Sequence, residues 1–387
     1  MSAAASGVRQ SVFAALQGRI DAFRAAGGEL IPLQIGDTHL PPPPSALGPI
    51  DDASELSLYG PVAGLPELRE ALAARHRARG LDVTPEHVLV GCGCTHAIFC
   101  AARALLDPGD DALVASPYWP LITGVLKTCG VHPIEVPLSW PLYDNPQLDL
   151  EALLEEHRTE KTRAVYIITP GNPDGQVLTE KQLEQVARFA RRHHLWVLAD
   201  EVYADFVYDG AHRSIAALPG MADRTVTGYS LSKSHALAGA RIGYVVGPPR
   251  VMAAARRISN HTLYNVPVPM QRAALRALDN DAAWLGEARD QYRAARDAAA
   301  RALDDIGLVY ELPRGGAYFF LDMSERLGGR PLAQLLERAI DEGVLLAPGE
   351  AFGDAYREFA RLCFTGVPRE RVLEGIARFG HALEGFH

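Results

Sequence analysis

Lysine is scarce in this sequence. Of the 38 basic residues only four are lysine, at positions 127, 161, 181 and 233. Arginine stays protonated in proteins, whereas a lysine can be desolvated, deprotonated and used as a nucleophile. Lys127, Lys161 and Lys181 lie on amphipathic or polar stretches, but Lys233 comes just after the strand-like segment 225–231. Lys233 is therefore a candidate for a reactive amine.

Cysteines are also few. The five in the chain are an odd number in a long sequence, which is not typical of a disulfide framework and favours a thiol-reducing, cytoplasmic setting. Cys92 and Cys94 have the spacing of half a metal site, but no second Cys/His pair follows at zinc spacing. We expect these cysteines to be small core residues and predict no metal site.

Long apolar runs and an excess of basic residues are absent. The longest apolar stretches, such as 195–199, are far below the ~20 residues that a membrane helix needs. No apolar run with a small-residue cleavage site lies in the first thirty residues, so we expect no signal peptide. The net charge of -9 disfavours binding to nucleic acid or to an anionic membrane.

What the chain does contain is an alternation of short β-branched runs with helical patterns from about residue 85 onward. Such alternation predicts an α/β fold with a mostly parallel seven-stranded sheet flanked by helices on both faces. The expected strands are 88–91, 112–116, 134–138, 163–169, 195–200, 225–231 and 241–246. The expected helices between them include 95–106 and 180–193, the second of which starts with a capping box at Thr179 and Gln182.

The pattern changes after about residue 280. A long helix over 281–306, short strands and two further helices indicate a smaller α+β domain. Its expected strands are 318–322, 344–347 and 360–365, and its later helices are 332–342 and 370–383. The segment before the proline run 41–44 is too short for a domain of its own, so we expect it to pack on this C-terminal part. The predicted division is 1–45 for the N-terminal arm and part of the small domain, 46–280 for the large cofactor-binding domain, and 281–387 for the small domain.

Ligands of open α/β sheets bind beyond the carboxyl ends of the strands, and polar groups gather there in this sequence. The turn 91–95 leads directly from a strand into a helix, whose N–H groups would bind an anion such as phosphate. A dinucleotide fingerprint is disfavoured, because His96 occupies the third glycine position and no acidic residue follows at the expected distance. Tyr118 and Trp119 follow the next strand, where a ring could stack on a flat cofactor or simply fill a surface position.

Two later strands are also followed by polar side chains. Asn172 lies in the turn-forming loop 170–175, and Asp200 and Tyr203 follow the apolar run 195–199. A carboxylate at the edge of the core requires a cationic partner, because burying it alone costs several kcal/mol.

Lys233 follows Ser230 and Ser232 at the end of another strand, and Arg241 comes eight residues later. An anion site, a flat ring, a buried carboxylate and a reactive amine together match pyridoxal phosphate, with Lys233 forming the Schiff base and Asp200 pairing with the ring nitrogen.

The same residues resemble the class I and II aminotransferases of the fold-type I pyridoxal-phosphate superfamily. The segment Ser230-Leu-Ser-Lys233, followed by Gly239-Ala-Arg241-Ile-Gly-Tyr244, is similar to the lysine signature of that family. The resemblance implies that Lys233 carries the cofactor and shuttles a proton, with Ser230, Ser232 and Arg241 at or near the phosphate.

The resemblance extends over nearly the whole chain. It implies that Asn172 lies near the ring hydroxyl and the substrate, Asp200 on the ring nitrogen, Tyr203 on the ring oxygen, and Trp119, rather than Tyr118, on the ring face. It also implies a phosphate turn at Gly93, Cys94 and Thr95, and a substrate α-carboxylate held by Arg361 beside Gly36. Tyr59, in a segment similar to the one that reaches a neighbouring subunit's phosphate, implies a homodimer.

The implied activity moves the amino group of an L-amino acid to a 2-oxo acid. Asp174 stands where threonine is common, and Cys92, Cys94 and His96 give the phosphate turn an uncommon composition. Other chemistry of the same cofactor therefore stays open, namely oxidation or hydroxylation, β-elimination, decarboxylation or cyclisation in specialised biosynthesis. A ligand-sensing regulator with this fold is disfavoured, because no added DNA-binding domain is evident. The sequence does not choose among aromatic, aliphatic, acidic or basic amino donors.

Overall fold

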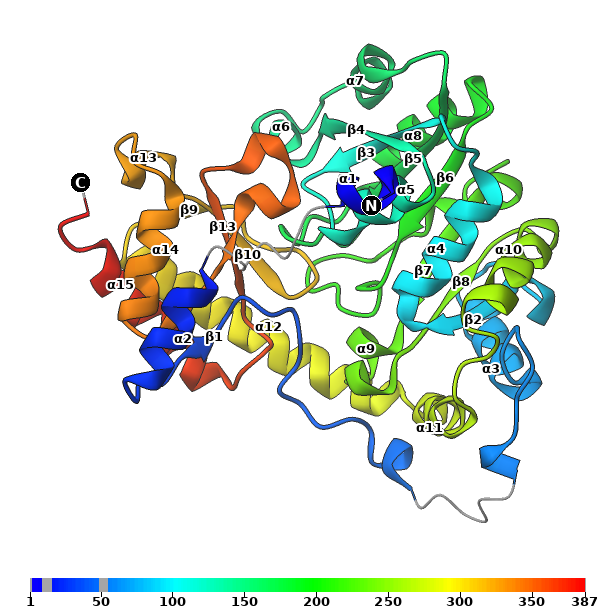
Figure 1. Ribbon diagram of the computed structural model, residues 1–387, viewed down its shortest axis with the longest axis horizontal. Coiled ribbons are helices and arrows are strands. Elements are labelled where there is room, and N and C mark those ends of the chain that lie inside the picture. Colours follow the sequence, from blue (N-terminus) through cyan, green and yellow to red (C-terminus); the bar gives the residue numbers. More distant parts are fainter. Residues whose placement is uncertain (1, 9–15, 49–54, 387) are drawn as a thin grey trace.

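The structure is a computed structural model that describes residues 2–8, 16–48 and 55–386 (Figure 1). A seven-stranded sheet forms its larger part, with the spatial order β2-β8-β7-β6-β5-β3-β4. The strands are β2 (Val88–Cys92), β3 (Asp111–Ser116), β4 (His132–Pro137), β5 (Thr162–Ile168), β6 (Trp196–Asp200), β7 (Thr225–Ser230) and β8 (Ile242–Val246). Each lies within two residues of its expected position, and the predicted fold class is confirmed.

Only β8 runs against the others in this sheet, since it pairs antiparallel with both β2 and β7. The remaining pairs are parallel, so the carboxyl ends of these strands meet at one edge. Along β5 and β6 the register places Ile168 opposite Asp200. Polar residues just beyond these strands are therefore neighbours in space.

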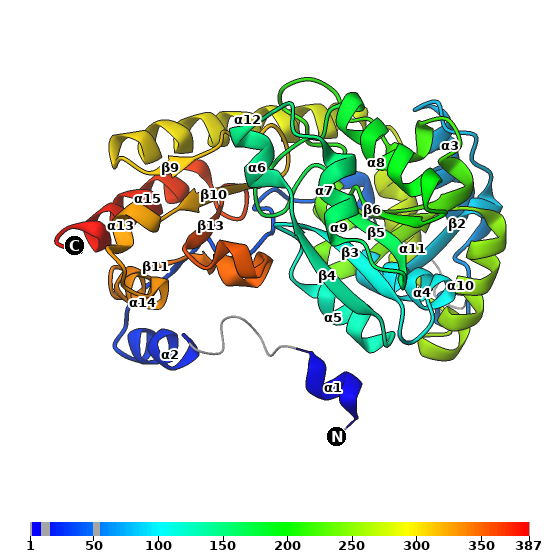
Figure 2. The same cartoon turned by 90° about the horizontal axis from the view of Figure 1, so that it is seen from above.

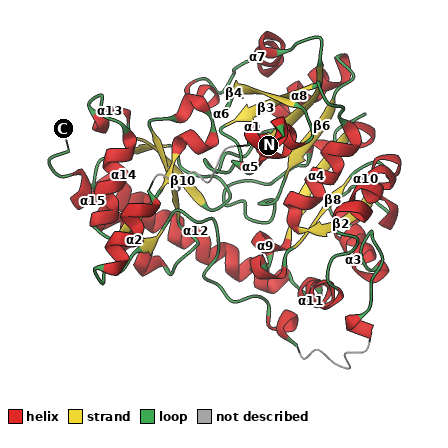
Figure 3. Cartoon of the chain, viewed as in Figure 1, coloured by secondary structure: helices red, strands yellow, loops and turns green. Residues whose placement is uncertain are grey.

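Helices cover both faces of this sheet (Figure 3). The core of one face is completed by α4 (Gly93–Leu105), α5 (Leu121–Thr128) and α10 (Pro249–Thr262). The other face packs against α7 (Leu150–His157) and α8 (Glu180–Arg192), and near β2 and β8 against α3 (Pro66–Arg77) and α11 (Val268–Leu278). The predicted capping box at Thr179 and Gln182 is present at the start of α8.

A second, antiparallel sheet forms the smaller part, with the order β12-β13-β10-β9. Its strands are β9 (Val309–Tyr310), β10 (Tyr318–Asp322), β12 (Ala347–Pro348) and β13 (Phe359–Cys363). The helices on it are α12 (Ala282–Asp305), α13 (Ser324–Leu327), α14 (Leu332–Asp341) and α15 (Arg369–Leu383). Figure 2 shows α12 running along this sheet beside α15, and these two helices share one core with α14.

The prediction of one continuous strand over 344–347 is wrong, because this segment forms two short strands. The chain bends at Leu346, so that β11 (Val344–Leu345) and β12 belong to different sheets. β11 pairs in parallel with β1 (Ile31–Pro32), a strand that the sequence pattern did not reveal.

The N-terminal segment divides between the two parts of the molecule. From α2 (Gln17–Ala25) to β1 it packs on the smaller part, as expected. By contrast, α1 (Ala3–Gly7) contacts α5 of the larger part, and the Val8 side chain approaches Gly124. The expectation that the whole N-terminal segment lies on the C-terminal part is therefore wrong for residues 2–8.

The remaining helices are short. They are α6 (Ser139–Asp144), α9 (Leu231–Ser234) and the 3-10 turns 44–47, 55–57, 85–87, 215–217, 222–224, 238–240, 349–352 and 354–356. Across the described ranges, no helix combines the length and apolarity needed to cross a lipid bilayer.

Candidate active site

A cavity of about 770 Å³ opens at the carboxyl edge of the large sheet and extends to the smaller part. Its lining includes every residue that the sequence analysis assigned to a site except Gly93 and Tyr59: Gly36, Cys94, Thr95, Trp119, Asn172, Asp200, Tyr203, Ser230, Ser232, Lys233, Arg241 and Arg361. Strands and turns far apart in the sequence therefore bring these side chains to one place.

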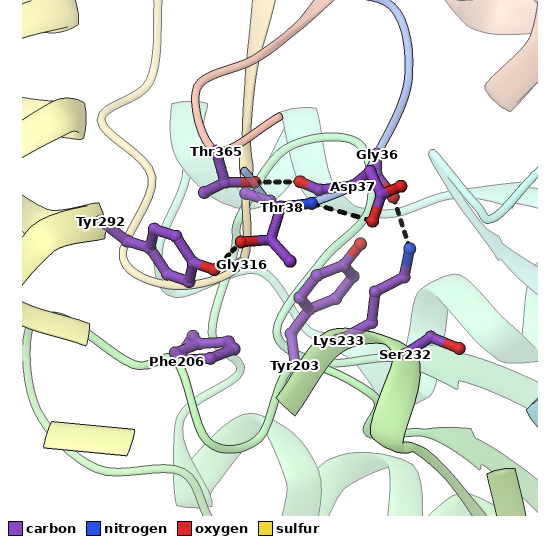
Figure 4. Close-up of a pocket in the computed structure, with 11 residues that line it drawn as sticks. Gly36, Asp37, Thr38, Tyr203, Phe206, Ser232, Lys233, Tyr292, Gly316 and Thr365 are labelled. Atoms are coloured by element: carbon purple, nitrogen blue, oxygen red, sulfur yellow. Dashed lines mark hydrogen bonds between the residues drawn. The ribbon is translucent and has the colours of Figure 1, made fainter. Parts of the chain in front are cut away.

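Lys233 projects from α9, a single helical turn between β7 and β8. Ser230 caps this turn by accepting a hydrogen bond from the Ser232 N–H at 3.2 Å. The Lys233 Nζ donates to the Gly36 carbonyl at 2.5 Å, so the amine points toward the segment that follows β1 (Figure 4). The lysine side chain thus reaches into the boundary between the two parts of the molecule.

Asp200 ends β6 and is 4% exposed. Its Oδ1 accepts from the Val202 N–H at 3.2 Å and its Oδ2 from the Tyr166 hydroxyl at 3.0 Å. Burial raises the pKa of this carboxyl to about 6, against the opposing effect of those two hydrogen bonds. No described cationic side chain forms an ion pair with Asp200, although the carboxylate lines the cavity.

Arg361 reaches the cavity from β13 on the other side. Its Nη1 donates to the Asn172 Oδ1 at 2.9 Å, and its Nη2 donates to the Gln34 carbonyl. The guanidinium carbon lies 4.3 Å from the ring centre of Tyr318 and 4.8 Å from that of Phe352. These contacts hold the fork rigid, while the buried Nε has no hydrogen-bond partner within residues 2–8, 16–48 and 55–386.

The turn from β2 into α4 faces Arg241. Gly93 has a φ of 75°, and a Cβ added there would lie 2.4 Å from the Arg241 Nη2. The Gly93 N–H donates to the Arg241 carbonyl at 2.8 Å, so the two segments are tied together. The N-terminus of α4 and a guanidinium therefore face the same end of the cavity, an arrangement that suits an anion.

Tyr203 is buried behind Lys233, and its hydroxyl is 2.6 Å from that of Tyr318. In Figure 4 the Tyr203 ring lies beside the Lys233 side chain. Both aromatic residues of the 117–120 turn contribute to the cavity lining, with Tyr118 buried and Trp119 half-buried.

Two expected site residues lie elsewhere in this chain. Tyr59 is 86% exposed and packs edge-to-face on Tyr264, at a ring-centre distance of 5.0 Å. Gly93 does not line the cavity but supports Arg241.

Packing explains most of the residues that depart from the usual family pattern. His96 accepts from the Cys92 N–H at 3.4 Å and lies 3.0 Å from the Thr262 hydroxyl, which makes it part of the contact between α4 and α10. Asp174 is buried outside the cavity, where its Oδ1 accepts from the Gln176 N–H. The described residues contain no cluster of three or more His, Cys, Asp or Glu that could hold a metal ion.

Comparison with known proteins agrees with this arrangement. The family model for aminotransferase class I and II matches residues 29–379. The chain belongs to this family. It is 36% identical to an arginine–pyruvate transaminase of Pseudomonas aeruginosa over 87% of this chain and 86% of the relative. It is 32% identical to an aspartate aminotransferase of Streptomyces avermitilis over 99% and 96% of the two chains.

A solved structure of similar shape is the aspartate aminotransferase of Thermus thermophilus with maleate. It superimposes with a TM-score of 0.90 at 30% identity, covering 99% of each chain. This chain is thus an aminotransferase, an enzyme that transfers amino groups.

Sequence reasoning missed two residues of this aminotransferase's cavity region. Tyr166 bonds Asp200 from the neighbouring strand, and Tyr318 contacts both Tyr203 and Arg361. Tyr166 lies within β5 and Tyr318 is the first residue of β10, so a search of the residues that follow the carboxyl ends of strands passes over both. The signal that was available is a hydroxyl group within the otherwise apolar run 164–168.

Proposed function

We propose that this aminotransferase binds pyridoxal phosphate at Lys233 and moves the amino group of an L-amino acid to a 2-oxo acid. The observation that supports the proposal best is that one cavity contains an amine, a buried carboxylate without an ion-pair partner and a rigid guanidinium: Lys233, Asp200 and Arg361. Amino-group transfer on this cofactor requires these three groups.

The residues fit this cofactor in two further respects. Asp200 is buried, and no described cationic side chain forms an ion pair with it, which is costly unless a cationic ligand such as a protonated ring nitrogen joins it. The Nε of Arg361 is a buried donor without a partner, as expected for a group that awaits a substrate carboxylate.

When bound, pyridoxal phosphate supplies a carbonyl that accepts the amino group and a ring that delocalises the electron pair left at the substrate Cα. We assign its phosphate to the N–H groups of 93–95, with Ser230, Ser232 and Arg241. Asp200 would hold the proton on the ring nitrogen, Asn172 and Tyr203 would bond the ring oxygen, and Trp119 would pack on the ring face.

Lys233 is the base of this mechanism. Its Nζ would take the proton from the substrate Cα and deliver it to the former carbonyl carbon of the cofactor, on the other side of the amino nitrogen. This general acid–base step requires the amine to be free. Arg361 binds the substrate α-carboxylate through its fork beside Gly36, which fixes the Cα–H bond relative to Lys233.

We also propose that the enzyme is a homodimer in which Tyr59 reaches the phosphate bound by the partner subunit. Its exposure in a single chain supports this role, because an 86% exposed tyrosine has little function in the monomer. The five free cysteines support a cytoplasmic location, where thiols stay reduced.

The first test is the absorption spectrum of the purified enzyme with pyridoxal phosphate, before and after addition of amino acids without an oxo acid. We expect a visible band that moves to the near ultraviolet as one equivalent of 2-oxo acid forms. In Lys233→Ala the visible band and turnover should be lost. Lys181→Ala is the matched control, because Lys181 is exposed and its side chain bonds, among the residues that the structure describes, only Gln147.

Each alternative gives a different result. Release of ammonia or uptake of oxygen would assign elimination or oxidation instead of transfer. A wild-type protein without any visible band after addition of the cofactor, or a Lys233→Ala variant with near-normal turnover, would overturn the proposal.

A further inference from the structure

We propose that Tyr166 is a positioning residue for the reaction: its hydroxyl fixes the Asp200 carboxylate and stabilises negative charge on it, so that the carboxylate keeps the proton on the cofactor ring nitrogen. The inference rests on the proposed function, because it assumes that Asp200 faces a ring nitrogen. Tyr166 does not line the cavity and acts only through Asp200.

The sheet register brings the two side chains together. Tyr166 is opposite Leu198, and Ile168 is opposite Asp200, so residues 166 and 200 project from the same face of neighbouring strands. Tyr166 is fully buried, and its hydroxyl donates to the Asp200 Oδ2 at 3.0 Å. No other hydrogen bond of this hydroxyl is found among the described residues.

The hydroxyl has no structural reason to be there apart from Asp200. The other residues of 164–168 are apolar, and the Tyr166 ring lies in the apolar core between the sheet and α4. Phenylalanine would fill the same space without burying a polar group, which costs free energy unless it is hydrogen-bonded. Burial also holds the pKa of Tyr166 well above its ordinary value, so the hydroxyl stays a donor.

The two hydrogen bonds to the Asp200 carboxylate are made to different oxygens. The Val202 N–H is on Oδ1 and the Tyr166 hydroxyl on Oδ2, which leaves further lone pairs on both oxygens for a ligand in the cavity. Removing the Tyr166 donor leaves one hydrogen bond to hold the orientation of the carboxylate.

The charge of Asp200 depends on the same contact. Burial raises the pKa of Asp200 to about 6, and Glu201 acts in the same direction, whereas the hydrogen bonds from Val202 and Tyr166 and the charge of Lys233 lower it. The neutral thiol of Cys94, on α4, is the remaining titratable group beside the pair. Without Tyr166 the carboxyl binds a proton more tightly and competes with the ring nitrogen for it.

The neighbouring carboxylate, Glu201, provides a matched control. The Tyr229 hydroxyl donates to the Glu201 Oε2 at 2.7 Å, so it is another buried tyrosine bonded to a buried carboxylate. Glu201 does not line the cavity and is paired with His212 instead. Tyr166→Phe and Tyr229→Phe therefore remove the same group and the same kind of bond, but only the first acts on the cofactor site.

The test uses the holoenzyme loaded with pyridoxal phosphate that carries ¹⁵N in its ring. At one fixed pH, the ¹⁵N chemical shift reports whether the ring nitrogen holds a proton. We expect the value of a protonated ring in wild type and in Tyr229→Phe, and a shift toward the unprotonated value in Tyr166→Phe. The kcat of Tyr166→Phe should fall roughly tenfold with little change in KM, because a hydrogen bond to a charged group is lost.

A second variant guards against a folding defect. 3-Fluorotyrosine at position 166 keeps the ring and the hydroxyl but donates more strongly, so it should leave the ring nitrogen at least as fully protonated as wild type. An unchanged ¹⁵N shift in Tyr166→Phe, or an equal change in Tyr229→Phe, would overturn the role of Tyr166. A wild-type ring nitrogen without a proton would instead contradict the assignment of Asp200 in the proposed function.

Discussion

Asp174 shows how a single residue beside the site affects stability without lining the cavity. It is 2% exposed, and its Oδ1 accepts from the Gln176 N–H at 3.3 Å. Burial raises the pKa of this carboxyl to about 6, above its ordinary value of 3.8. The folded protein therefore holds this proton more tightly than the unfolded chain does, and folding is opposed once the pH favours ionisation.

We accordingly expect Asp174→Asn to stabilise the protein in a pH-dependent way. The stability that a protonated Asp174 gives is complete below pH ~4 and is lost as the pH rises through about 6. The variant should match wild type near pH 4 and exceed it by roughly 2–3 kcal/mol at pH 8, since one pKa unit is worth ~1.4 kcal/mol. Thermal unfolding of the cofactor-free protein from pH 4 to 8 measures this difference, and a difference that does not vary with pH would contradict the explanation.

Which side chains meet at the cavity was predictable at the residue scale. Residue types with reactive groups follow strand after strand, and parallel strands end at one edge. Asp200 and Lys233 were found in this way, whereas Arg361, which lies within β13 of the antiparallel sheet, was assigned only from the family resemblance. All three line the cavity, although their roles stay predictions. Tyr166 was not found, because a tyrosine within a strand is typical of ordinary core packing.

At the scale of elements, the strands of the large sheet were predictable because each is a β-branched run bounded by turn residues. The two-residue strands β1 and β9 were not predictable, because so short a segment shows no periodicity and each strand is defined only by the strand it pairs with. The break at Leu346 has the same cause, because an apolar run does not reveal which of two sheets each half joins.

The turn between β2 and α4 gives the prediction at this scale. In Gly93→Ala, a Cβ would displace the Arg241 guanidinium and strain a backbone with a φ of 75°, so affinity for pyridoxal phosphate should fall tenfold or more. Gly109→Ala is the control, because Gly109 has a φ of 97° but open space around it. Cofactor titration followed by absorbance compares the two, and equal affinities would show that this turn does not hold the phosphate.

Across the whole molecule, exposed apolar side chains suggest where a second copy binds. Leu58, next to Tyr59 in the sequence, is 66% exposed, and Tyr264, whose ring packs on that of Tyr59, is 45% exposed. Apolar residues gathered on one surface are typical of an interface. The boundaries proposed at residues 45 and 280 stay predictions, because packing of the N-terminal segment on both parts obscures where one unit ends.

A variant with Leu58→Glu and Tyr264→Glu should therefore dissociate. We expect sedimentation equilibrium to give the mass of two chains for wild type and of one chain for the variant, because unpaired buried charges oppose association. The variant should also bind pyridoxal phosphate more weakly, as it loses the partner's Tyr59. Val309→Glu, at a 51% exposed position on β9, is the control. A wild-type monomer, or a variant that stays dimeric, would rule out this interface.

The segment that receives the Lys233 amine has a consequence for how the enzyme is made. Gln34 and Asp37 bond Arg361 and Thr365 across sequence separations of 327 and 328 residues. On the ribosome, the early segment emerges long before its partners exist and must wait with its apolar strand uncovered. Arg361 joins the site only after the 327 residues that separate it from Gln34 have been synthesised. A partly made chain is therefore inactive, and chaperones have their greatest opportunity to bind at the N-terminal segment.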